Sequence, residues 1–168
     1  QSARLERQEI KLNLQALDAH DSIRKVADNL SLQIQEKDGV LTLNLSAPTP
    51  IVRVDEVHFS NIIFNLLDNA IKYSKSGLEI NISTLIQNGM LAIKVKDNGI
   101  GMNKETQSHI FEKFYRAHTG NLHDVKGFGL GLNYVKAITE AHGGKVKVES
   151  ALNRGSTFTV TFPLDNNG

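Results

Sequence analysis

Residues 61–74 predict a helix that is apolar around most of its circumference and polar along one narrow stripe. At about 100° per residue, the stripe falls within roughly an 80° arc and consists of Asn61, Asn65, Asn69 and Lys72. Most of the remaining surface is apolar, through Ile62, Ile63, Phe64, Leu66, Leu67, Ala70 and Ile71. Such a helix must be largely buried, and a buried amide is costly unless it is hydrogen-bonded. We therefore expect the stripe to face a polar ligand or a water-filled cleft.

A solvated surface is the alternative interpretation of this stripe, and for helices in general it is the more common one. Solvated helix faces normally carry Glu, Lys and Gln, which favour the helix, whereas Asn is a poor helix former. The two asparagines at Asn65 and Asn69, one turn apart, therefore favour a binding role.

The composition is that of one globular domain with a hydrophobic core. The chain has 168 residues, of which 40% are hydrophobic, and a net charge of +1 with both signs mixed along the sequence. This pattern indicates neither a nucleic-acid partner nor direct membrane contact. The absence of cysteine excludes disulfides and is compatible with the reducing cytoplasm. Because the first residue is Gln1 and no signal peptide follows, we expect the chain to be part of a longer protein.

Hydrophobic periodicity predicts three or four helices and five or six strands. The helices are expected over residues 18–37, 55–74, 103–112 and 130–142, with Asp18 or Asp21, Asp55 and Asn103 as N-caps. The strands are expected over residues 40–45, 51–54, 78–87, 90–96, 145–150 and 156–164, with a tight hairpin at Asn88-Gly89. These elements predict an α/β (α+β) two-layer sandwich, in which about three helices cover one face of a mixed, mostly antiparallel sheet of about five strands.

Two glycine-rich segments are candidate ligand loops. Asp97-Asn98-Gly99-Ile100-Gly101-Met102 follows a strand, and Gly127-Phe128-Gly129-Leu130-Gly131-Leu132 leads into a helix. Turns also use glycine, so each segment alone is weak evidence. The second segment differs from the phosphate-loop signature GxxxxGK[ST] and does not follow a strand of a dinucleotide-binding unit. Its glycines would still let backbone N–H groups approach a polyphosphate at the positive end of the following helix.

Five motifs together produce a specific resemblance. They are Asn65-x-x-x-Asn69 with Lys72-Tyr73, Asp97-x-Gly99-x-Gly101, Phe111-x-x-Phe114-Tyr115-Arg116, Gly127-x-Gly129-x-Gly131 and Gly155-Ser156. In this order and spacing, over about residues 20–164, the chain resembles the catalytic ATP-binding domain of sensor histidine kinases of two-component systems. The resemblance implies the Bergerat-type ATP-binding fold of the superfamily of gyrase, Hsp90, MutL and histidine kinases. It also implies a catalytic domain over residues 18–164, a remnant of the preceding dimerisation element over residues 1–17, and a tail over residues 165–168.

The resemblance implies one set of residues around the base of ATP. Asp97 would accept a hydrogen bond from the exocyclic amine of adenine, where guanine presents an acceptor instead. Ser156 would add a water-mediated contact to the base, and the backbone at Gly99 and Gly101 would pass beside it. Tyr73, Ile100 and Met102 would border the nucleotide pocket.

A second set is implied around the phosphates. Asn65 and Asn69 would offer amide oxygens to Mg²⁺, a hard cation held mostly by substrate phosphates. Lys72, Arg116 and Lys126 would meet phosphate charge, and Asn65, Asn69, Lys72 and Arg116 would be the catalytic residues. The backbone would cradle the phosphates at Gly127, Phe128, Gly129, Leu130, Gly131 and Leu132. Residues 117–126 correspond to a lid over the nucleotide.

The amide at Asn65 distinguishes a kinase from an ATPase. Hydrolases of the superfamily carry at this position a Glu that activates water as a general base, and an amide cannot accept that proton. We therefore expect the chain to hold Mg-ATP and to donate the γ-phosphoryl group to a histidine on a separate dimerisation domain. A non-catalytic nucleotide-sensing module is the alternative.

The expected phospho-acceptor histidine is not found in the chain. His20-Asp21-Ser22-Ile23-Arg24 lacks the proline and the spacing of the acceptor motif, so His20 is predicted to be a polar residue beside a helix start. The other histidines are predicted to be structural or surface residues, namely His58, His109, His118, His123 and His142. The implied partners are the protein's own dimerisation and phospho-acceptor domain and a response-regulator receiver domain. The implied location is the cytoplasm, including the cytoplasmic part of a membrane-bound sensor.

Overall fold

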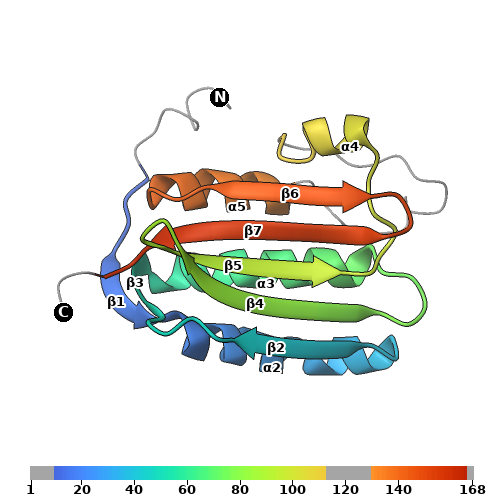
Figure 1. Cartoon of the computed structure of the whole chain (residues 1–168), viewed down its shortest axis with the longest axis horizontal. Helices are drawn as coiled ribbons and strands as arrows, with labels where there is room; N and C mark the ends of the chain where they lie inside the picture. The colour runs from blue at the N-terminus through green and yellow to red at the C-terminus, as the bar shows by residue number, and fades with distance from the viewer. Residues whose placement is uncertain (1–9, 113–129, 166–168) are drawn as a thin grey trace.

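Five strands form one sheet in the order β2-β4-β5-β7-β6 (Figure 1). The computed structural model describes residues 10–112 and 130–165. The strands are β2 (Val40–Leu45), β4 (Glu79–Gln87), β5 (Met90–Asp97), β6 (Val146–Ala151) and β7 (Gly155–Pro163). Strand β2 runs parallel to β4, and the other neighbouring strands of this sheet are antiparallel. The predicted mixed, mostly antiparallel sheet is confirmed.

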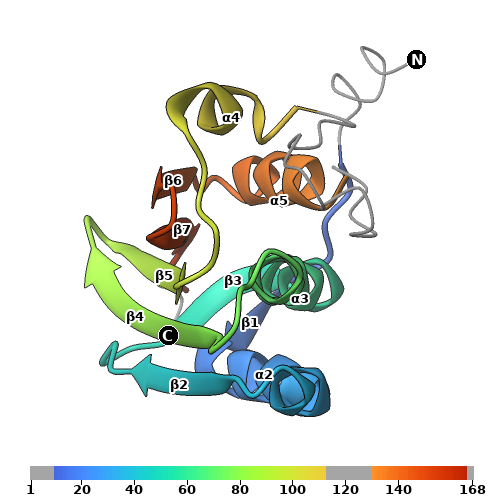
Figure 2. The same ribbon diagram turned by 90° about the vertical axis from the view of Figure 1, so that its right-hand side faces the viewer.

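Three helices lie on one face of this sheet, with α3 between the other two (Figure 2). They are α2 (Ala19–Glu36), α3 (Glu56–Lys72) and α5 (Leu130–Ala141). Their apolar sides and one face of the sheet form a single core, in which Phe59 meets Phe162 edge-to-face with ring centroids 5.1 Å apart. The predicted two-layer sandwich is therefore confirmed. No helix in the described part of the chain is long and apolar enough to cross a membrane.

The predicted helix caps at Asp18 and Asn103 and the predicted hairpin at Asn88-Gly89 are confirmed. Asp18 and Asn103 cap their helices, because their side chains accept hydrogen bonds from backbone N–H groups of the first turn. Asn88 and Gly89 have φ values of +54° and +75°, as a tight hairpin between β4 and β5 requires. The helix after Asn103 is shorter than predicted. Helix α4 (Lys104–His109) ends at His109. The next backbone hydrogen bond, from Ile110 N to Gln107 O, reaches back three residues, as in a 3₁₀ turn, instead of the four of an α-helix.

Helix α3 is buried on the sides that face α2, α5 and the sheet. Six of the seven apolar residues expected in its interior are buried, namely Ile62, Ile63, Leu66, Leu67, Ala70 and Ile71. The expectation is wrong for Phe64, whose relative exposure is 41%. Phe64 and Val57, two turns earlier on α3, are both exposed, so no further layer covers this side of the helix within residues 10–112 and 130–165. The exposed arc of α3 is therefore wider than its polar stripe.

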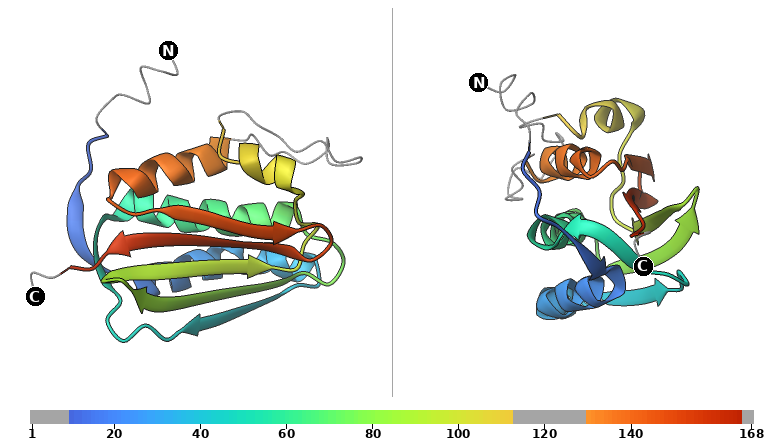
Figure 3. Two further views of the ribbon diagram at one scale, coloured as in Figure 1. Left: turned by 45° about the horizontal axis from the view of Figure 1, so that its top comes forward. Right: turned by 90° about the vertical axis from the view of Figure 1, so that its left-hand side faces the viewer.

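A strand that the sequence did not predict precedes α2. Strand β1 (Leu14–Asp18) pairs antiparallel with β3 (Ile51–Asp55), and the two form a second sheet at the end of the helical layer where α3 begins (Figure 3). Most of β1 is exposed, so its residues show little alternation of apolar and polar side chains. Its pairing depends on β3, some 35 residues later, which a local pattern cannot reveal. The domain boundary at residue 18 stays a prediction.

Asp55 joins three parts of the fold at the start of α3. Its Oδ1 accepts a hydrogen bond from the N–H of His58 (3.1 Å), and its Oδ2 accepts one from the N–H of Asn13 (2.9 Å). Its own N–H donates to Nε2 of His142, which follows α5 (3.1 Å). The bond from Asn13, more than any other contact, lowers the pKa of the Asp55 carboxyl. One residue thus ties the N-terminal segment, α3 and the end of α5 together.

We expect Asp55→Ala to lower the free energy of unfolding by about 2 kcal/mol, because it removes a helix cap and leaves a second N–H without its acceptor. Asp18→Ala is the matched control, since Asp18 caps α2 through neighbouring residues alone and should cost about 1 kcal/mol. Urea denaturation measures both. Because the folded pKa of Asp55 is lowered, the difference between Asp55→Ala and the unaltered chain should shrink as the pH falls below about 4. Equal losses for the two variants at neutral pH would contradict the joining role of Asp55.

Candidate functional site

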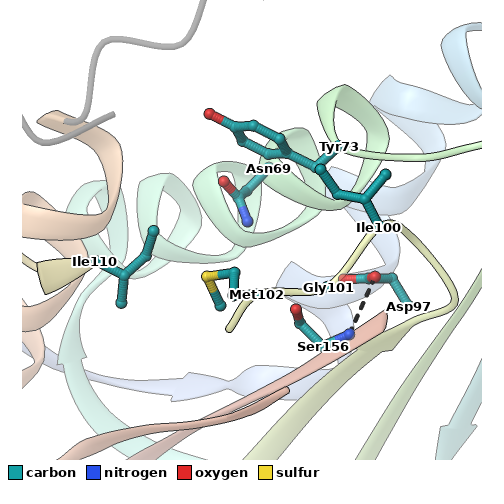
Figure 4. Close-up of a pocket in the computed structure, with 8 residues that line it drawn as sticks. All are labelled: Asn69, Tyr73, Asp97, Ile100, Gly101, Met102, Ile110 and Ser156. Atoms are coloured by element: carbon teal, nitrogen blue, oxygen red, sulfur yellow. Dashed lines mark hydrogen bonds between the residues drawn. The ribbon is translucent and has the colours of Figure 1, made fainter. Parts of the chain in front are cut away.

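A pocket opens between the C-terminal end of α3, the loop after β5 and the start of β7 (Figure 4). It is lined by Asn69, Tyr73, Asp97, Ile100, Gly101, Met102, Ile110 and Ser156. The empty space between these residues is about 390 Å³ with open solvent included. The structure thus brings together seven residues that the sequence assigned to one nucleotide site. Ile110 was missed, because one apolar residue after a short polar helix gives no binding signal.

Asp97 lies on the floor of this pocket with a relative exposure of 8%. Its Oδ1 accepts hydrogen bonds from the N–H groups of Gly99 (2.8 Å) and Ser156 (3.3 Å). Burial raises the pKa of the Asp97 carboxyl, and the two backbone hydrogen bonds oppose that rise. Among the described residues, no hydrogen bond uses Oδ2 of Asp97. This oxygen can therefore accept a hydrogen bond from a ligand.

The glycines of the loop after β5 are required by contacts with other backbone segments. Gly101 has a φ of +70°, and a Cβ there would lie 1.9 Å from the carbonyl oxygen of Ala151. A Cβ on Gly99 would lie 2.5 Å from the carbonyl oxygen of Tyr73. The passage of this backbone beside a purine stays a prediction. The structure shows that protein backbone occupies the space where the side chains of both glycines would be. The loop is therefore locked between α3 and the β6–β7 turn, which holds Asp97 in place.

The asparagine stripe leads from the pocket to the first turn of α5. Asn69 lines the pocket, and Asn65 lies one turn earlier on α3. The Asn65 Nδ2 donates a hydrogen bond to the carbonyl oxygen of Asn61 (2.7 Å), which identifies the other amide atom as the oxygen. A Cβ on Gly131 would lie 3.0 Å from that oxygen. The amide oxygen of Asn65 therefore stands beside the beginning of α5.

Lys72 is engaged by a neighbouring carboxylate. Its Nζ lies 2.8 Å from Oδ2 of Asp68, one turn earlier on α3, and both side chains are about one-third exposed. Lys72 was predicted to meet phosphate charge, and a phosphate there would share this lysine with Asp68 or displace it. The pair is too exposed for the contact alone to add much stability.

Several predicted site residues lie outside the described residues. They are Arg116, Lys126, Gly127, Phe128 and Gly129, with the predicted lid over residues 117–126. Leu132 is buried in the hydrophobic core, so its side chain packs beneath the start of α5 rather than lining the pocket. A binding role for the backbone at Leu130 to Leu132 stays a prediction.

The stripe suits a hard cation that a ligand brings with it. Among the described residues there is no group of three or more His, Asp or Glu side chains that could hold a metal ion. The amide oxygens of Asn65 and Asn69 are oxygen donors of the kind that Mg²⁺ accepts beside substrate phosphates. These residues therefore fit a magnesium ion whose other ligands come from phosphates and water.

The family model for histidine kinase-, DNA gyrase B- and HSP90-like ATPases matches residues 54–166. The chain is 46% identical over 99% of its length to the sensor protein RprX of Bacteroides fragilis (strain YCH46), of which it covers 33%. It is 33% identical over 96% of its length to the sensor histidine kinase YkoH of Bacillus subtilis (strain 168), of which it covers 34%. The chain thus spans about a third of the length of the curated relatives it matches.

Solved structures share the fold. Full-length ShkA in complex with AMPPNP superposes with a TM-score of 0.82 at 29% identity, over 96% of this chain and 33% of ShkA. The catalytic domain of the histidine kinase ThkA superposes with a TM-score of 0.79 at 23% identity, over 90% of this chain and 96% of that domain. The second similarity extends over almost the whole of an isolated catalytic domain.

We expect Asp97→Asn to leave the ligand-free chain at least as stable as the unaltered chain at pH 7. The folded pKa of Asp97 is raised, so folding disfavours its charge, and the stability of the unaltered chain should decline as pH rises from about 3.8 through the raised pKa. An asparagine retains an oxygen for Gly99 and Ser156 and carries no charge. Thermal unfolding between pH 3 and pH 8 measures the profile, with the exposed Asp28→Asn as control. A large loss of stability at pH 7 would show that the Asp97 charge supports the fold.

Proposed function

The chain belongs to the family of histidine kinase-, DNA gyrase B- and HSP90-like ATPases, and we propose that it acts as the ATP-binding catalytic domain of a sensor histidine kinase. It would bind Mg-ATP in the cleft along α3 and donate the γ-phosphoryl group to a histidine of a separate dimerisation domain. The observation that carries this proposal is that the buried carboxylate of Asp97 shares a pocket with Asn69. One turn earlier on α3, the amide oxygen of Asn65 lies beside the start of α5.

At the closed end of the cleft, Asp97 supports recognition of adenine. Its Oδ2 would accept the hydrogen bond that the exocyclic amine donates. Guanine carries an oxygen at that position, so two acceptors would face each other in a buried site. The apolar side chains of Ile100, Met102 and Ile110 would pack on the base (Figure 4). This arrangement favours ATP over GTP.

At the open end, the stripe supports a place for the triphosphate. Asn69 and Asn65 present their amides in order from the pocket to Gly131, where α5 directs its positive N-terminal end. When bound, Mg²⁺ would neutralise phosphate charge and orient the γ-phosphoryl group for in-line attack. In that attack a histidine nitrogen forms the N–P bond while the bond to the leaving oxygen of ADP breaks. Lys72 would contact the phosphates, either shared with Asp68 or after Asp68 is displaced. Arg116 and Lys126 keep their predicted roles of meeting phosphate charge.

The side chain of Asn65 favours a kinase over a hydrolase. Its Nδ2 donates to Asn61, and its oxygen is an amide oxygen that cannot take a proton from water near neutral pH. ATP in this cleft would lack a general base from Asn65 and would remain available for transfer. The next step of the proposed pathway is relay from the phosphohistidine to an aspartate of a response-regulator receiver domain. We place these events in the cytoplasm.

Two buried histidines are unsuited to act as the acceptor. His20 lies in the first turn of α2, as predicted, but it is buried, and its Nε2 lies 2.8 Å from Oγ1 of Thr84. His142 is also buried. Its Nε2 accepts a hydrogen bond from the N–H of Asp55, and its Nδ1 donates one to the carbonyl oxygen of Ile138 (2.8 Å). Neither imidazole can reach a γ-phosphoryl group without unfolding its surroundings.

We expect Asn69→Ala to reduce phosphoryl transfer by at least about 100-fold in the full-length protein, because it removes a group that positions the charged phosphates. Transfer of label from γ-labelled ATP to the acceptor histidine measures the effect. The control is Asn44→Ala, the same substitution at an exposed position of β2. This edge strand contributes none of the described residues that line the pocket. Unchanged transfer in Asn69→Ala would contradict the kinase proposal and would favour a nucleotide-sensing module. Stoichiometric labelling of the 168-residue chain alone would contradict the separate acceptor.

A further inference from the structure

A hydroxyl group joins α5 to α3 just beyond the end of the predicted nucleotide cleft. The Tyr134 Oη on α5 lies 2.6 Å from Nδ1 of His58 on α3, within hydrogen-bond distance. The rings of Tyr134 and His58 lie at 37° with centroids 5.8 Å apart. His58 extends the asparagine stripe by one turn, because it lies three residues before Asn61. Neither Tyr134 nor His58 has a role in the function proposed above.

The hydroxyl of Tyr134 links the two helices through a side-chain hydrogen bond. Burial raises the pKa of Tyr134, so the hydroxyl keeps its proton at neutral pH. A phenylalanine at this position would fill the same space but would leave Nδ1 of His58 without this bond.

The contact lies one helical turn from the phosphate end of the cleft. Tyr134 follows Gly131 by three residues, so the two share one side of α5. Asn61 precedes Asn65 by four residues on α3 and accepts the hydrogen bond from its Nδ2. The Tyr134 contact and the approach of Gly131 to Asn65 are therefore about 5 Å apart along the helices. A tilt of α5 would move the backbone N–H groups of its first turn relative to Asn65.

We propose that the hydrogen bond between Tyr134 and His58 forms a clamp that holds the first turn of α5 against Asn65 and so sets the phosphate end of the cleft. The inference rests on the proposed binding of ATP along α3. Tyr134 and His58 are positioning residues, since they act through Asn65 and the start of α5. Displacements of about 1 Å are costly for groups that must align a reacting phosphate. The adenine end depends on Asp97 and Ser156 from β5 and β7, which the clamp does not touch.

The test is the affinity of Tyr134→Phe for ligands that differ in phosphate content. In the 168-residue chain, calorimetric titration with Mg-ATP, Mg-ADP and adenosine separates the two ends of the cleft. We expect Tyr134→Phe to bind Mg-ATP about tenfold more weakly, as loss of the bridging hydrogen bond to His58 implies, and to bind adenosine within about twofold of the unaltered chain. His58→Phe should give a similar loss. The double variant should lose no more than either single variant, because the two residues form one clamp.

Thr139→Val is the matched control, because it also removes a hydroxyl from α5. Thr139 is fully buried, and its Oγ1 has no hydrogen-bond partner among the described residues. Its ATP affinity should equal that of the unaltered chain. Unchanged Mg-ATP affinity in Tyr134→Phe would overturn the clamp, and so would an equal loss for ATP and adenosine, which would indicate general damage to the fold. If the unaltered chain binds adenosine or ATP too weakly to measure, the proposed function itself fails.

Discussion

Burial of the apolar sides of α3 sets the rotation of this helix, and each part of the cleft depends on that rotation. Helix α3 packs against α2, α5 and the sheet, and this rotation places Asn65 of the polar stripe beside the start of α5. Polar contacts hold both ends of the helix in register. Asp55 caps its start, and the Nζ of Lys37, just after α2, donates to the carbonyl oxygen of Ile71 near its end (3.0 Å). The asparagines are thus presented by a rigid element.

The carboxylate at Asp97 shows a conflict between stability and binding. A buried carboxylate that accepts two backbone hydrogen bonds at one oxygen still has an oxygen without a protein donor among the described residues. Folding gains little from this charge, as its raised pKa indicates. A group of this kind is retained where a ligand supplies the missing donor. The locked loop around Gly99 and Gly101 keeps this acceptor in place before the ligand arrives.

The proposed phosphate end of the site is organised differently from the proposed adenine end. The adenine end is built from the backbone of adjacent strands and a loop in contact with other backbone. The phosphate end lies where two helices meet, and side chains such as Tyr134 and His58 set their relative position. Lys72 is already paired with Asp68. The adenine end is therefore preformed by main-chain contacts, whereas the geometry at the phosphate end depends on side-chain hydrogen bonds that single substitutions can remove.

The sequence by itself determined the helix α3, its stripe, the caps at Asp55 and Asn103 and the hairpin at Asn88, because each depends on residues within a few positions of one another. The ordered motifs also identified most of the pocket, since ligand chemistry restricts which residue types can occur there. Only the tertiary structure decided the pairing of β1 with β3, the exposure of Phe64 and the contact of Tyr134 with His58. These features join segments that are far apart in the chain or depend on which helix side is covered. The glycines illustrate the division, because their positions were evident in the sequence, but the backbone neighbours that require Gly101 became visible only in the fold.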